Sequence, residues 1–257
     1  MRVKKYYKLV RVDYEDSAYL RLKNVSNESG TFNITKNESW MNKNFKYSLD
    51  GVNWTSYDIS TSPSITLAPG ANIYLKGNNV STSDGSGSYT NIHFDKNFEL
   101  HGNICSLLNE DPAVFSQINS ITSSYCFLKL FYGNTTLVSV GDIFSTITTV
   151  SAERAFNNIF GGCTALQSID FSNITSVSGI NTFNQACGAC SNLSNVKSPN
   201  VSSWSSSFGN WLLNAGTSVS GTKTIYIPSG LTVGTGTDEI PLNSNNGIPT
   251  GWSYDTY

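Results

Sequence analysis

The stretch Phe160–Asn173, "FGGCTALQSIDFSN", returns in part at Cys190–Val196, "CSNLSNV", with a Cys three residues before a Leu and an apolar residue three places after it. A third copy of the strand-like pair lies upstream. The three pairs are Leu137 and Val140 in "LVSV", Leu166 and Ile169 in "LQSI", and Leu193 and Val196 in "LSNV". The leucines stand 29 and then 27 residues apart. A period of this length predicts a leucine-rich solenoid.

A matching segment precedes each pair. These segments are "FLKLFYGNTTL" from Phe127, "AFNNIFGGCTAL" from Ala155 and "TFNQACGACSNL" from Thr182. In each segment an apolar residue is followed by another three or four places on, and then by a turn of small residues. This pattern predicts a short helix that ends in a C-cap. The apolar pair that comes next predicts a strand. One unit cannot bury its apolar face, so the units are expected to stack and share a core.

The cysteine pattern indicates packing rather than chemistry. Five cysteines leave one unpaired in any full disulfide scheme. Cys187 and Cys190 have no second pair at zinc-like spacing, and the two histidines, His93 and His101, lie far upstream. Cys163 and Cys190 repeat with the solenoid period, and Asn134 takes their place in the first unit. Buried thiols are therefore favoured over a disulfide or a metal site, and no cofactor is expected.

The predicted repeat core follows from this alignment. It comprises Leu137, Val140, Cys163, Leu166, Ile169, Cys190, Leu193 and Val196.

Residues 1–97 have a different pattern, with short alternating runs between clusters of Asn, Gly, Ser, Asp and Pro. The runs are "YKLVRV", "YLRLKNV", "GTFNIT", "FKYSLD", "SITL" and "NIYLKG". Strands at this spacing predict an antiparallel β-sandwich. Asp50-Gly51 predicts a hairpin turn and Pro69-Gly70 a second turn. The segment 81–88, "STSDGSGS", is expected to be a polar, flexible loop, and 110–118 a single helical turn or a short helix.

The predicted fold is thus mainly β, with an N-terminal sandwich domain at 1–97 that anchors or assembles the protein. A short leucine-rich-repeat solenoid with a C-terminal cap follows at 98–257. The tail, "KTIYIPSGL" and "IPTGWSYDTY", is expected to supply the last strand and the cap that closes the open end of a solenoid.

The stretches "IFGGCTALQSIDFSNITSV" and "ACSNLSNVKSPNVSSW" resemble the BspA-type leucine-rich repeat, in which a Phe and a small-residue turn with Cys precede a "CxxLxxLxLSN" strand. The resemblance covers roughly residues 100–257. Cys163, Leu166, Ile169 and Phe171 match the pattern, whereas Pro199 interrupts the third unit. The lead-in resembles the β-domain that precedes such repeats in surface and phage proteins of anaerobic gut bacteria. The resemblance implies adhesion or virion structure rather than catalysis.

Composition and motifs exclude several classes. The net charge of −2 argues against nucleic-acid binding, and no apolar run is long enough to predict insertion into a membrane. The N-terminal residues lack the apolar region of a signal peptide. Neither histidine lies in a triad-like context, and no phosphate-binding glycine motif occurs. We therefore expect a protein that is not an enzyme.

Two functions remain open. The first is a structural protein of a tailed-phage virion, such as a capsid decoration, head fibre or tail component, with other virion proteins and copies of itself as partners. The alternative is a bacterial cell-surface adhesin with a glycan or protein receptor. Aromatic side chains dominate binding hot spots, and the predicted interaction surface comprises Trp204, Trp211 and Trp252. Packing inside the domains is the other use of these residues.

Overall fold

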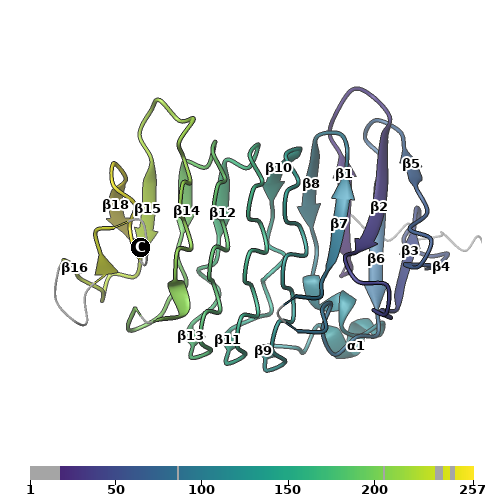
Figure 1. Cartoon of the computed structure of the whole chain (residues 1–257), viewed down its shortest axis with the longest axis horizontal. Helices are drawn as coiled ribbons and strands as arrows, with labels where there is room; N and C mark the ends of the chain where they lie inside the picture. The colour runs from purple at the N-terminus through teal and green to yellow at the C-terminus, as the bar shows by residue number, and fades with distance from the viewer. Residues whose placement is uncertain (1–17, 86, 205, 235–239, 244–246) are drawn as a thin grey trace, which may run out of the picture.

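The computed structural model describes residues 18–85, 87–204, 206–234, 240–243 and 247–257. Within them the chain is mainly β, and its strands lie side by side along the long axis of the molecule (Figure 1). The predicted strand "YKLVRV" lies outside the described residues. No helix among the described residues is long and apolar enough to cross a bilayer.

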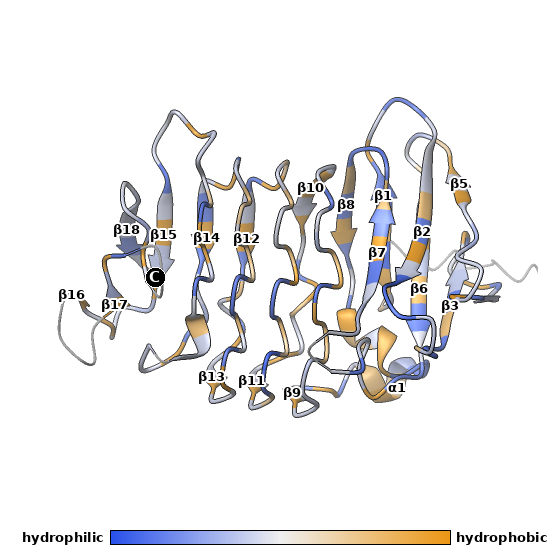
Figure 2. Ribbon diagram, viewed as in Figure 1, coloured by the Kyte–Doolittle hydropathy of each residue, from blue (hydrophilic) through white to orange (hydrophobic). Residues whose placement is uncertain are grey.

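The first eight strands form antiparallel ladders. They are β1 (Leu20–Asn24), β2 (Gly30–Lys36), β3 (Phe45–Ser48), β4 (Thr55–Tyr57), β5 (Ile65–Leu67), β6 (Asn72–Gly77), β7 (Thr90–Phe94) and β8 (Phe98–His101). Strands β8, β1, β6, β3 and β4 form one sheet in that order, and β5, β2 and β7 form a second. Buried and half-buried residues alternate along β1, as the sequence predicts for a strand with one face in the core. Figure 2 shows that hydrophobic and hydrophilic residues both occur along the strands of this region.

The two sheets meet through Tyr57. Its hydroxyl accepts a hydrogen bond from the backbone N–H of Ile34 in β2 at 2.7 Å. Its ring meets the Phe32 ring edge-on, with 6.1 Å between centroids. Tyr57 lies on β4 and therefore ties the far edge of the larger sheet to the centre of the smaller one.

Two local predictions in this region are confirmed. Strands β3 and β4 pair as an antiparallel hairpin, and Gly51 in its turn has φ of +74°. The Asp50 carboxylate accepts hydrogen bonds from the backbone N–H groups of Val52 and Asn53 and holds the turn rigid. The predicted helix at 110–118 contains α1 (Pro112–Phe115), which Asp111 caps.

The described residues of the segment 81–88 form a loop, as predicted, but part of this loop is buried. Ser81, Thr82 and Ser83 are buried rather than exposed in a polar loop. The Thr82 N–H donates to the carbonyl of Cys126 at 2.8 Å, and the Ser83 hydroxyl donates to that of Tyr125 at 2.6 Å. Thr82 and Ser83 thus provide hydrogen-bond partners for backbone carbonyls of the first solenoid turn.

The rest of the chain forms a β-solenoid of about four turns. Short 3₁₀ helices lie at η2 (Ile104–Leu107), before it, and at η3 (Ser206–Phe208). Its strands are β9 (Ser120–Ile121), β10 (Leu137–Val140), β11 (Thr149–Val150), β12 (Ser168–Asp170), β13 (Ser176–Val177), β14 (Asn195–Lys197), β15 (Thr224–Ile227), β16 (Val233–Gly234), β17 (Ile240–Pro241) and β18 (Ser253–Thr256).

The solenoid strands pair in parallel. Strands β12, β14, β15 and β18 form one sheet, and β9, β11 and β13 form a second along another side of the stack (Figure 1). Strand β10 pairs in parallel with β8, so the larger antiparallel sheet leads directly into the solenoid. The division at residue 97 stays a prediction. The predicted last strand corresponds to β15, and β18 extends the sheet beyond it.

The predicted short helix in each unit is wrong. Residues 125–133, 154–162 and 181–189 contain tight turns in place of the three expected helices. Residues 207–214 form a fourth, unpredicted segment of the same kind, in which turns follow the end of η3. We call these four ranges the turn segments. A residue with positive φ recurs at every fourth position, as at Arg154, Asn158 and Gly162. Backbone N–H groups alternate between a partner within the segment and one in the next turn: Ile159 N–H donates to Phe156, and Phe156 N–H donates to Thr182.

Stacked phenylalanines fill the core behind the turn segments. Phe127, Phe156, Phe183 and Phe208 occupy the same position in four successive turns, and all are buried. Their ring centroids are 5.8, 5.3 and 5.3 Å apart along the stack. The eight residues predicted as the repeat core are also buried, in one cluster that extends into the antiparallel sheets. These contacts between turns offset the cost of the left-handed backbone positions.

Candidate functional site

The outer side of the β12–β14–β15–β18 sheet presents side chains in straight rows, because the strands pair in register. One row passes through equivalent positions of the four strands, and the other lies two residues earlier on each. The first comprises Asp170, Lys197, Tyr226 and Asp255, and the second Ser168, Asn195, Thr224 and Ser253. We call these eight residues the row face. Ile169, Val196 and Ile225 lie between the rows in sequence and point into the core.

A surface ion pair lies within the first row. Lys197 Nζ is 3.2 Å from a carboxylate oxygen of Asp170, and both side chains are about half exposed. Burial by itself raises the pKa of Asp170. Hydrogen bonds from the Ser172 hydroxyl and N–H, and the pair with Lys197, outweigh burial and lower this pKa overall. Asp170 therefore carries its charge at neutral pH, and Lys197 neutralises it locally.

The row face is hollowed beside the strand β10. An open cavity of about 220 Å³ is lined by Val140, Ser168, Ile169, Asp170, Asn195, Val196, Lys197 and Tyr226. Gly141 follows Val140 in β10 as Asp170 follows Ile169 in β12. The position after β10 that corresponds to Asp170 therefore has no side chain. A Cβ on Gly141 would lie 3.0 Å from the Leu100 carbonyl oxygen and 3.3 Å from Nδ1 of His101.

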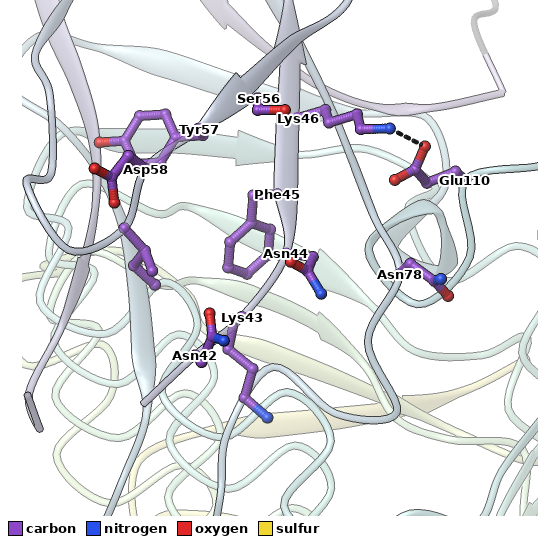
Figure 3. A pocket seen from close by; sticks show the side chains of 11 residues that line it. Asn42, Lys43, Asn44, Phe45, Lys46, Ser56, Tyr57, Asp58, Asn78 and Glu110 are labelled. Carbon is purple, nitrogen blue, oxygen red and sulfur yellow. Dashed lines mark hydrogen bonds and ion pairs between the residues drawn. The ribbon is translucent and has the colours of Figure 1, made fainter. Parts of the chain in front are cut away.

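A second open cavity, of about 360 Å³, lies in the antiparallel region (Figure 3). Lys46 Nζ lies 2.7 Å from Glu110 Oε2 at its rim. Lys43 pairs with Asp84. Most charged groups here thus have a partner of opposite sign, and Asn42, Asn44 and Asn78 supply amide groups. The hollow is therefore lined mainly by hydrogen-bonding groups.

The structure places the predicted tryptophans differently from one another. Trp211 is fully buried, and its indole N–H donates to the Gly247 carbonyl at 3.0 Å. Trp252 is 8% exposed. Trp204 is half-buried and stacks on Phe208, with ring centroids 4.2 Å apart. The predicted interaction surface is therefore corrected: Trp211 and Trp252 belong to the buried core.

Two cysteine thiols contact backbone carbonyl oxygens of the preceding turn. All five cysteines are free and buried. Cys163 Sγ lies 3.1 Å from the Phe131 carbonyl oxygen of the preceding turn, and Cys190 Sγ lies 3.0 Å from that of Phe160. Burial raises the pKa of the Cys163 thiol, so it stays protonated and can donate. Asn134, at the equivalent place in the first unit, also donates to Phe131.

No group of three or more His, Cys, Asp or Glu side chains in the described part of the chain has the geometry of a metal site. The row face was missed by reasoning from sequence. A signal was present, because Asp170, Lys197 and Tyr226 each follow an aligned apolar residue. Strand alternation alone would have pointed them outward.

Comparison of the chain with models of known protein families, with curated proteins and with solved structures found no match. The likeness to the BspA-type repeat therefore stays a prediction.

Proposed function

We propose that this protein is a binding and structural protein, not an enzyme, that presents the row face of its solenoid for attachment. The observation that carries the proposal is the register of the four parallel strands, which sets polar side chains in straight rows on a hydrogen-bonded support. A rigid support limits the entropy lost on binding. Polar, half-exposed rows are suited to recognition and contribute little to the core.

We place the protein in the virion of a tailed phage, as a capsid decoration, head fibre or tail component. The five free, buried cysteines support this assignment. Thiols persist in reducing compartments such as the cytoplasm, where phage particles assemble, whereas disulfides form and persist in oxidising environments outside it. Other virion proteins and copies of the chain itself are the proposed partners. A bacterial surface adhesin is the alternative.

The antiparallel region is the proposed anchor. We describe its two sheets as the predicted sandwich, a description supported by the Tyr57 contacts with Phe32 and Ile34. The leucine-rich-repeat class is proposed for the solenoid only because a pair of apolar residues, such as Leu166 and Ile169, recurs in each unit. The turn segments do not support that class, because it was expected to have a helix there.

Immunogold electron microscopy with antibodies against the purified chain tests this assignment. The sample is a culture of a bacterium that carries the gene, in which phage growth has been induced, and an uninduced culture is the control. Gold on purified particles is expected. Gold on cell envelopes of the uninduced culture would support the adhesin instead, and label on neither would overturn both assignments.

A further inference from the structure

We propose that the row face binds a neutral, hydroxyl-rich polysaccharide that lies across the strands. This inference rests on the proposed function, because it names the ligand class of the same attachment surface. The cavity beside β10 begins the binding track, and the rows that end at Ser253 and Asp255 continue it.

The functional groups of the cavity match hydroxyl groups. The Asn195 amide and the Ser168 hydroxyl each both donate and accept hydrogen bonds, as a sugar hydroxyl does. Asp170 adds an acceptor and Lys197 a donor, fixed relative to each other by their 3.2 Å contact. Tyr226, which is half-buried on the next strand, offers a ring edge or face to the apolar side of a sugar.

The charges favour a neutral ligand over a polyanion. Lys197 is the one cation of the row face and already pairs with Asp170, and Asp255 adds a second carboxylate. A nucleic acid or a sulfated chain needs a run of cations to neutralise it, and this face has none. A neutral polysaccharide has no charge for these carboxylates to repel.

The geometry favours a repeating chain over a folded protein. The centres of protein interfaces are depleted in charged residues, whereas this face carries an ion pair in its cavity and a further carboxylate, Asp255, on its last strand. Successive strands lie about 4.7–4.9 Å apart, so a ligand that crosses them meets an equivalent position at each strand. A polymer of similar units can use several strands at once, and each added contact strengthens binding.

Affinity gel electrophoresis tests the proposal with four soluble neutral polysaccharides as probes: dextran, laminarin, galactomannan and hydroxyethyl cellulose. Dextran sulfate serves as the anionic probe. We expect at least one neutral polymer to slow the migration of the full chain. Tyr226→Ala and Asn195→Ala should each weaken that binding about tenfold, the effect of losing one ring contact or hydrogen bond.

The matched control is Tyr132→Ala, which removes an exposed tyrosine from a turn segment and should leave binding unchanged. Thermal melting of each variant shows that it is folded, and Asn195, an exposed residue, provides a test if Tyr226→Ala is destabilised. Retardation by no neutral polymer, or by dextran sulfate alone, would overturn the proposal. Equal loss of binding in Tyr132→Ala would also do so. If immunogold labels the phage particles but the chain binds no neutral polysaccharide, this ligand class is refuted and the proposed function stands.

Discussion

The antiparallel region and the solenoid use backbone pairing in opposite ways. Strand β1 pairs with β6 and β8, which are distant in sequence, and each of these registers occurs once. In the solenoid, each turn segment pairs with the next one, roughly 24 to 28 residues on, through the same pattern of hydrogen bonds. The first region therefore depends on individual strand pairings that occur once each. The second depends on one hydrogen-bond pattern that recurs between successive turns.

Backbone strain follows the same division. Of the described non-glycine residues with positive φ, only Ser62 lies outside the turn segments. A left-handed residue costs roughly 1–2 kcal/mol, and it persists only where surrounding contacts hold it. In the turn segments those contacts are the phenylalanine stack and the hydrogen bonds between turns. The comparison shows that the solenoid tolerates local strain because each turn is held by both neighbours.

The largest expected effect is that of Phe156→Ala, which removes the centre of the ring stack. Phe156 is fully buried and contacts Phe127, Phe183 and Phe144. We expect a loss of about 3–5 kcal/mol in the free energy of unfolding, measured by urea denaturation. The same change at Phe32, in the antiparallel region, is the matched variant. Since both belong to one core cluster, each should shift a single common transition, and two separate transitions would break the picture of a shared core.

Glycine substitutions test close backbone approach in both regions. A Cβ at Gly179 would lie 2.1 Å from the Ala152 carbonyl oxygen, and one at Gly77 would lie 2.5 Å from that of Asn44. Alanine at either position should cost about 1–3 kcal/mol in urea denaturation. Gly221→Ala is the control, because no atom lies within 4 Å of its added Cβ. A loss at Gly221 equal to the other two would show that close approach is not the cause.

A smaller change addresses the strain in the turn segments directly. Ala189 is exposed and has φ of +57°. Ala189→Gly should raise the free energy of unfolding by up to about 1 kcal/mol, because glycine adopts this backbone freely. Ala113→Gly, in α1, should lower it by about 0.5–1 kcal/mol. Destabilisation of equal size in both variants would contradict the assigned strain.

The smallest expected effect concerns Asp50 in the β3–β4 hairpin. Hydrogen bonds from the Asn53 N–H and side chain, Val52 and Ser48 hold the pKa of its carboxyl well below the ordinary value. A lowered folded pKa stabilises the fold above the unfolded pKa of about 3.9, and this contribution is lost as pH falls towards the folded pKa. Between pH 7 and pH 3, the melting temperature of the wild type should fall slightly more than that of Asp50→Asn. An equal fall would remove Asp50 as a source of pH dependence.

Prediction from sequence succeeded where a residue's role is local. The alternating runs predicted β1 and β6, and Asp50-Gly51 predicted the hairpin, because glycine at that turn permits a positive φ. The turn segments were missed because the spacing of Phe156, Ile159 and Phe160 fits a helix as well as a repeated four-residue turn. What selects the turns is hydrogen bonding to another part of the chain, which a local pattern does not contain.

The candidate site shows the same limit. Residue type suggested Trp211 as a binding residue, yet the chain folds over it and Gly247 accepts its N–H. The fourth turn was not recognised, although Ser207 and Phe208 continue the series of Thr182-Phe183 and Ala155-Phe156. Its strand was identified only as a last strand.

The sequence by itself determined that the chain is mainly β, that its second part repeats, and which apolar positions of each repeat enter the core. These three properties follow from the periodicity of apolar residues, which is visible in the sequence without the structure. Tertiary structure alone decided the backbone of the turn segments, the burial of Trp211 and the alignment of Asp170, Lys197 and Tyr226 in one row. Each of these depends on contacts between turns that form only when the chain has stacked, and such contacts outweigh local conformational preference.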